Sequence, residues 1–116
     1  MNENRLPDYL SHMRQAVTDA GSFVEGLSKE DFLRDKRTQQ AVVLSLIVLG
    51  EAATKVMDRY PDFANAQPQI PWRSMRGMRN RIAHGYFDID LDVVWDTVLT
   101  ALPALSEQLN GLENWR

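Results

Sequence analysis

A short basic segment carries the side chains in this sequence that are best suited to chemistry. Between Trp72 and His84 there are four arginines and no acidic residue. The net charge of the whole chain is −3, so this positive charge is a local feature of an acidic protein. Guanidinium groups offer fixed, paired donors that match phosphate oxygens, and we therefore expect an anion to bind at this segment.

Three of the arginines, Arg73, Arg76 and Arg79, are spaced three residues apart and share one face of a helix. Two interpretations stay open for Arg73 and Arg76. They either form a stripe that binds phosphate, or they form salt bridges with carboxylates of other helices. Asn80, beside Arg79, either positions His84 or a phosphate, or is an exposed helix residue.

His84 is the next residue of interest, because histidine changes its protonation state near neutral pH and acts as a general acid or base. Gly85 and Tyr86 follow it, and Tyr86 adds a second side chain that carries a proton. On a regular helix, Arg79 and His84 lie about 140° apart around the axis. They converge only if the helix ends near His84 or if a second subunit completes the site.

Composition argues against several other kinds of site. The chain has no cysteine, which excludes a disulfide scaffold, a thiolate nucleophile and a cysteine-bound zinc. Its two histidines, His12 and His84, are far apart in the sequence, so we expect no metal or other cofactor, and we interpret His12 as structural. The polar start is unlike a signal peptide, and the apolar run 41–49 is too short to span a bilayer. We therefore expect a cytoplasmic protein without a membrane segment.

The elements that position these residues are predicted to be helices, because apolar residues recur with helical spacing and no sustained alternation is present. The predicted helices cover about 6–24, 28–33, 35–59, 71–84 and 88–109. The fold class is therefore all-α, an up-and-down bundle of four main helices plus a short helix, in a single domain over 1–116. Residues 62–69 are predicted to form a loop.

Local signals mark the ends of these helices. Gly26 and Gly85 are expected to end the first helix and the helix over 71–84, which Pro71 begins. The run 41–49 is apolar nearly all round, which predicts a central, buried helix, and Pro103 is expected to kink the last one. The proposed N-terminal caps are Ser28 with a capping box, Asp35 or Thr38, and Asp88 or Asp90. Trp72 and Trp95 are expected in the core.

Glu51 stands out in the otherwise apolar helix over 35–59, directly after Gly50. A buried carboxylate at such a position needs a partner. We interpret Glu51 mainly as the ion-pair partner of an arginine from the helix over 71–84, in support of the site.

The segment from Arg79 to His84 resembles the R-x4-6-H motif of HEPN-domain ribonucleases, and its extension to Tyr86 resembles the HepT branch of that family. The similarity covers most of the chain. It includes His12-Met13, Phe32, Asp35, Gly50-Glu51-Ala52, Pro71-Trp72-Arg73 and Val94-Trp95.

This resemblance implies a toxin of a toxin–antitoxin pair that cleaves RNA without metal, with Arg79 and His84 as catalytic residues. The RNA 2′-OH is an internal nucleophile, so proton transfer and charge stabilisation suffice for cleavage. Supporting or phosphate-contact roles fall to Asn80, Arg76, Arg73 and Glu51. The resemblance also implies a homodimer with the two motifs facing across a cleft. Its partner would be an antitoxin of minimal nucleotidyltransferase (MNT) fold that transfers AMP to Tyr86.

An alternative from another class is a non-catalytic helical HEPN module that binds nucleotides or mediates an interaction. In that case Arg79 and His84 bind phosphate or stabilise a dimer, and cleave nothing. A metal-dependent hydrolase is disfavoured by the lack of clustered ligands.

Overall fold

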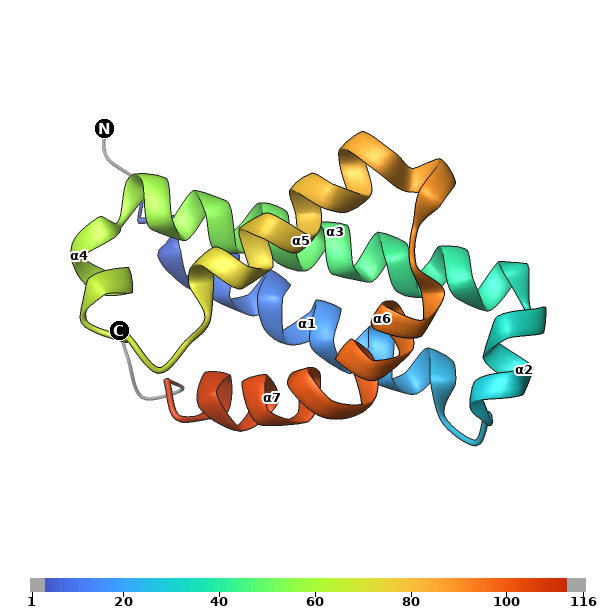
Figure 1. The fold of residues 1–116 in the computed structure, drawn as a ribbon. Coiled ribbons are helices and arrows are strands. Elements are labelled where there is room, and N and C mark those ends of the chain that lie inside the picture. Colours follow the sequence, from blue (N-terminus) through green and yellow to red (C-terminus); the bar gives the residue numbers. More distant parts are fainter. Residues whose placement is uncertain (1–3, 113–116) are drawn as a thin grey trace.

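The computed structural model describes residues 4–112, and every regular element in this range is a helix (Figure 1). Three long helices, α1 (Leu6–Val24), α3 (Lys36–Arg59) and α5 (Trp72–Gly85), alternate in direction. The fourth long segment is continuous and consists of α6 (Leu91–Asp96), η2 (Thr97–Ala101) and α7 (Leu102–Asn110). The short helices are α2 (Lys29–Arg34), α4 (Pro61–Asn65) and η1 (Tyr86–Asp88). The predicted all-α up-and-down bundle is confirmed.

Helix α3 lies at the centre of the bundle, with α1 packed on one side and α5 on another (Figure 1). The predicted central position is confirmed, but the apolar run is only partly buried, because Leu44 is 61% exposed and Val48 39%. The neighbouring helices cover only part of the circumference of α3 and leave this side open. By length and hydropathy α3 would also suit a membrane span. The core helix of a bundle meets the same criteria, and α3 supplies buried residues to the core.

The predicted caps form at the starts of α2 and α3. Ser28 and Asp31 make the capping box, with the Asp31 amide donating to Ser28 Oγ at 3.0 Å and the Ser28 amide donating to the Asp31 carboxylate at 3.2 Å. Asp35, and not Thr38, caps α3, because the Thr38 amide donates to Asp35 Oδ1 at 3.1 Å. At the end of α1, Gly26 adopts a positive φ of 79°, as expected of a glycine that stops a helix.

The segment α6–η2–α7 has the predicted N-terminal cap, and the irregularity predicted at Pro103 takes another form than a kink. Asp90 caps α6 and Asp88 does not, since the amides of Asp92 and Val93 donate to Asp90 Oδ1. Pro103 lacks an amide proton for the preceding helical turn. The chain accommodates this by winding η2 as a π-helix directly before α7, so the irregularity predicted at Pro103 is spread over η2.

The prediction of a loop over 62–69 is wrong in its first half, where α4 forms. Pro61 suits the first helical position, and Phe63 packs edge-on against Trp72 with ring centroids 6.4 Å apart. The Trp72 indole N–H donates to the carbonyl oxygens of Ala64 and Gln67, which joins α4 to the start of α5. Helix α5 begins at Trp72 itself, so Pro71 precedes the helix instead of beginning it.

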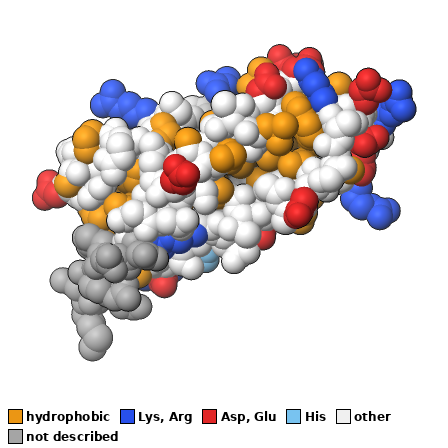
Figure 2. Space-filling model, turned by 90° about the horizontal axis from the view of Figure 1, so that it is seen from below, with side chains coloured by type: hydrophobic (Ala, Val, Ile, Leu, Met, Phe, Trp, Pro, Cys, Tyr) orange, Lys and Arg blue, Asp and Glu red, His pale blue; other side chains and the backbone are white. Residues whose placement is uncertain are grey.

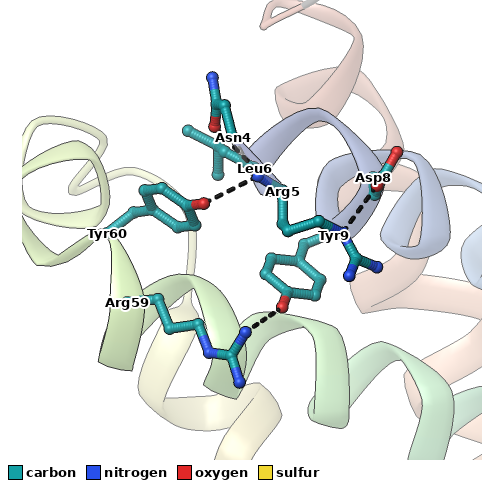
Figure 3. Close-up of polar contacts among 7 residues, drawn as sticks. All are labelled: Asn4, Arg5, Leu6, Asp8, Tyr9, Arg59 and Tyr60. Carbon is teal, nitrogen blue, oxygen red and sulfur yellow. Dashed lines mark hydrogen bonds and ion pairs between the residues drawn. The ribbon is translucent and has the colours of Figure 1, made fainter. Parts of the chain in front are cut away.

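Polar contacts join the start of α1 to the end of α3 (Figure 3). The Tyr60 hydroxyl accepts a hydrogen bond from the Arg5 amide at 2.8 Å, and the Tyr9 hydroxyl accepts one from Arg59 Nη1 at 2.8 Å. Arg5 also donates through Nε to Asp8 at 2.9 Å. These contacts fix the register of α1 against α3.

Helix α2 fastens the opposite end of the bundle. Phe32 is fully buried and packs against Trp95 of α6 with ring centroids 5.4 Å apart. Lys29 pairs with Asp92 at 3.0 Å, and its hydrogen bond to this carboxylate raises the pKa of Lys29. Trp72 and Trp95 are both buried, as predicted.

Candidate active site

The face of α5 that packs on α3 carries Arg79 among apolar residues. Met75 and Ile82 are buried on this face, and Arg79 lies between them in the helical register. The helix predicted over 71–84 therefore forms, and it holds Arg79 against the central helix of the bundle.

Arg79 forms an ion pair with Glu51 of α3, through Nη1 and Oε1. This is the kind of partner that the sequence predicts for Glu51. The expectation that Glu51 is buried is wrong, since its side chain is 50% exposed while that of Arg79 is 20% exposed. The buried Nε of Arg79 has no hydrogen-bond partner within the described range. The pair therefore holds a mostly covered guanidinium where α5 meets α3, with part of its donor set unused.

The other arginines of α5 fall into two groups: Arg76 resembles Arg79, with a carboxylate partner on α3 and a buried Nε that has no described hydrogen bond, whereas Arg73 and Arg81 do not. Arg76 pairs with Asp58 of α3 at 2.7 Å, which favours the salt-bridge interpretation for this residue. Arg73 and Arg81 are exposed, and no ion pair is described for either of them within residues 4–112. Arg73 is therefore placed to meet an anion from solution, whereas Arg76 already has a carboxylate.

His84 lies in the last turn of α5 and is exposed. In the part of the chain that the structure describes, no hydrogen bond or ion pair joins His84 to Arg79 or Asn80. Since α5 continues to Gly85, Arg79 and His84 stay about 140° apart around the helix axis. A single protomer does not bring the two predicted catalytic side chains together.

Tyr86 follows α5 in the short helix η1 and is 60% exposed. Its ring stacks on Phe87, with centroids 4.4 Å apart and an interplanar angle of 29°, and Phe87 is 86% exposed. These rings border a groove of about 600 Å³ that also contacts Leu44 and Ile47 of α3. Sequence reasoning did not single out Phe87. The feature that could have identified Phe87 is its position: it is an apolar aromatic residue directly after Tyr86, in the short connection between α5 and α6.

Within the same described range, no group of three or more histidine, cysteine, aspartate or glutamate side chains is arranged to hold a metal ion. The second histidine, His12, is exposed on α1 and lines a separate shallow groove with Phe23 and Val48.

The four-helix arrangement, with an arginine–histidine motif in the last two turns of α5, defines a HEPN-type domain. The family model described as Ribonuclease HepT-like matches residues 13–112, and the chain belongs to this family.

Proteins with related sequences bear names that agree with the family. A Thermococcus cleftensis protein named "Probable ribonuclease HepT" is 38% identical over 90% of this chain and 93% of its own length. A Methanocaldococcus jannaschii protein whose name begins "Putative RNase" is 37% identical over 84% of this chain and 75% of its own. No solved structure matches the chain significantly. Family membership thus points to a ribonuclease.

Proposed function

We propose that this protein is a metal-independent endoribonuclease and the toxin of a HEPN/MNT toxin–antitoxin pair in the cytoplasm, with Arg79 and His84 as its catalytic residues. The observation that carries the proposal is the anchored, partly exposed Arg79 in a HepT-like motif whose histidine faces solvent. The site offers an electrophilic group and a proton-transfer group, which is what RNA cleavage by an internal nucleophile requires.

In the proposed reaction the 2′-oxygen of a ribose attacks the adjacent phosphorus, and the bond from phosphorus to the 5′-oxygen breaks. One imidazole takes the proton from the 2′-OH, and a proton is returned to the leaving 5′-oxygen. Arg79 stabilises the negative charge that develops on the non-bridging oxygens. The products are a 2′,3′-cyclic phosphate and a 5′-OH end, and no cofactor enters the balance.

A homodimer supports this chemistry, because a second copy supplies a second His84 and can place it near the first copy's Arg79. Arg73 is placed to contact phosphates outside the scissile position, and Asn80 stands next to Arg79 in the exposed part of α5. Arg76 and Glu51 act mainly through their ion pairs, which hold α5 and the Arg79 guanidinium.

The test is cleavage of a labelled single-stranded RNA of mixed sequence by purified, folded variants. Arg79→Ala and His84→Ala should each lower kcat by about 100-fold or more, since each removes a transition-state contact. His12→Ala is the matched control and should keep full activity. Cleavage should persist in EDTA and leave cyclic phosphate ends. Full activity in His84→Ala, or strict dependence on Mg²⁺ with 5′-phosphate ends, would refute the proposal.

One observation favours a second candidate, a non-catalytic HEPN module: Arg79 already has a carboxylate partner, as a structural arginine would. In that case the wild-type protein binds RNA or a nucleotide without cutting it. The same cleavage assay, combined with a binding measurement, separates the two functions.

A further inference from the structure

Gly50 stands in the middle of α3, a helix of 24 residues, where glycine is unfavourable relative to alanine. It is buried. Such a residue is expected only where a side chain cannot be accommodated.

The neighbours of Gly50 supply that reason. A Cβ atom built on Gly50 would overlap the Cβ of Arg79, and it would lie 2.8 Å from the Met75 carbonyl oxygen and 3.0 Å from Arg79 Cγ. The Met75 oxygen belongs to the backbone of α5, so rotation of a side chain cannot relieve this contact. The backbones of α3 and α5 approach each other closely at Gly50, and the stem of Arg79 lies against it.

The next residue of α3 completes the arrangement. Glu51 pairs with the guanidinium of Arg79, whose stem rests on Gly50. With 20% exposure, the Arg79 side chain is more covered than that of Arg76, at 35%. The aliphatic stem of Arg79 is confined by the close approach of α3 and α5, and its guanidinium is confined by the Glu51 carboxylate.

We infer that Gly50 is a positioning residue for Arg79: its missing side chain lets α5 approach α3 and sets the guanidinium where it can meet a scissile phosphate. The inference rests on the proposed function for its catalytic consequence. The steric part stands on the geometry alone. Gly50 itself touches no substrate.

The first test is kinetic. Gly50→Ala should lower kcat for the labelled RNA by about tenfold or more, because small displacements of a transition-state contact are costly, with a smaller change in KM. Matched controls are Gly77→Ala in α5 and Gly21→Ala in α1. A Cβ at Gly77 would meet its nearest neighbour at 3.6 Å, and one at Gly21 would meet nothing within 4 Å. Both controls should keep the wild-type rate.

A double substitution separates positioning from general damage. In an Arg79→Gly background, Gly50→Ala should cause a much smaller further loss than it causes in the wild type, because the guanidinium that Gly50 positions and the overlapping Cβ are both absent. A further tenfold loss would overturn the inference, as would wild-type kcat in Gly50→Ala alone.

A readout independent of activity keeps this inference separate from the proposed function. The Arg79 Nε is buried, so its N–H should give a resolved, slowly exchanging NMR signal, assigned by its loss in Arg79→Lys. In Gly50→Ala this signal should shift and broaden, because the Nε–H becomes more accessible and exchanges faster with water. In Gly77→Ala it should stay unchanged. If RNA is not cleaved by the wild type but this shift occurs, the proposed function fails and the positioning role stands. An unchanged Nε signal would overturn the positioning role.

If Gly50→Ala is too unstable for kinetics and NMR at the assay temperature, melting temperatures provide the test. Arg79→Gly should lower Tm in the wild-type background, since glycine weakens a helix. In the Gly50→Ala background it should lower Tm less, because it removes the overlapping Cβ of residue 79 while the contact with the Met75 carbonyl oxygen remains. An equal decrease in both backgrounds would overturn the inference.

Discussion

The Arg79 guanidinium has donors left for a substrate. It carries five N–H groups, and the described contacts use only Nη1, which binds Glu51. Because Glu51 is half exposed, the pair contributes at most about 1 kcal/mol to folding. Its main effect is therefore to orient the guanidinium.

The three tyrosines of the chain differ in how their hydroxyl groups are engaged. Those of Tyr9 and Tyr60 accept hydrogen bonds that join α1 to α3, and Tyr9 is buried. Tyr86 is 60% exposed, and within residues 4–112 its hydroxyl has no hydrogen bond. This distinction supports Tyr86 as the proposed AMP acceptor, since the hydroxyl of a packed structural tyrosine would be engaged as those of Tyr9 and Tyr60 are.

We predict that co-expression with a cognate MNT nucleotidyltransferase adds AMP to Tyr86 and silences the RNase. The added phosphate carries about one negative charge, which can pair with the arginines of α5 and block RNA by charge and size. Intact-mass and peptide mass spectrometry should locate the adduct on Tyr86, absent in Tyr86→Phe and retained in Tyr60→Phe. Equal silencing of Tyr86→Phe with no mass change would mean inhibition by occlusion alone.

At the scale of the element, the start of α3 depends on one carboxylate. Asp35 accepts hydrogen bonds from the Thr38 hydroxyl at 2.7 Å and the Thr38 amide at 3.1 Å, and these bonds lower the pKa of Asp35. A lowered pKa in the folded state means that the ionised cap stabilises the protein above the unfolded-state pKa. That contribution is lost as the pH falls through the folded-state value.

We therefore predict that Asp35→Ala lowers the free energy of unfolding at pH 7, and that the difference from wild type narrows as the pH falls below about 4. Urea unfolding of both proteins across this pH range provides the measurement. Glu25→Ala is the control, because Glu25 is exposed and has no described side-chain hydrogen bond. A difference that stays constant with pH would contradict the assignment of the cap.

At the scale of the whole molecule, a large amount of apolar surface stays exposed. On the face in Figure 2, hydrophobic side chains gather in a patch in the right half of the view. The large apolar residues with substantial exposure are Phe23, Leu33, Leu44, Val48, Tyr86, Phe87, Val93 and Leu99. Exposed apolar patches of this kind mark interaction sites, which supports the proposed homodimer.

We predict that the active site is shared between two protomers, because Arg79 and His84 diverge on one α5. Light scattering should give a dimer at micromolar concentration. Mixing inactive Arg79→Ala with inactive His84→Ala should restore about a quarter of wild-type activity, since half of the dimers are mixed and each holds one complete site. The control is each variant alone, at the same total protein concentration and after the same incubation. A fully active monomer, or no restoration in a mixture proven to exchange subunits, would contradict this prediction.

The sequence predicted the helices and most of their ends, because helical periodicity and capping are local properties. The capping box at Ser28 and the stop at Gly26 needed only neighbouring residues. It also indicated the R-x4-H motif and a carboxylate partner for an arginine of α5. The helix α4 was missed because its formation depends on Phe63 packing against Trp72, a contact between segments.

The packing of the helices was needed to show which arginine meets Glu51, which side of α3 stays open, and why a side chain is excluded at Gly50. These features depend on how α5 lies across α3, and the spacing of residues along each helix does not determine that crossing. Spacing shows that Arg73, Arg76 and Arg79 share a face. Packing decides that Arg79 contacts Gly50 and Glu51, because backbones can approach closely only where no side chain separates them.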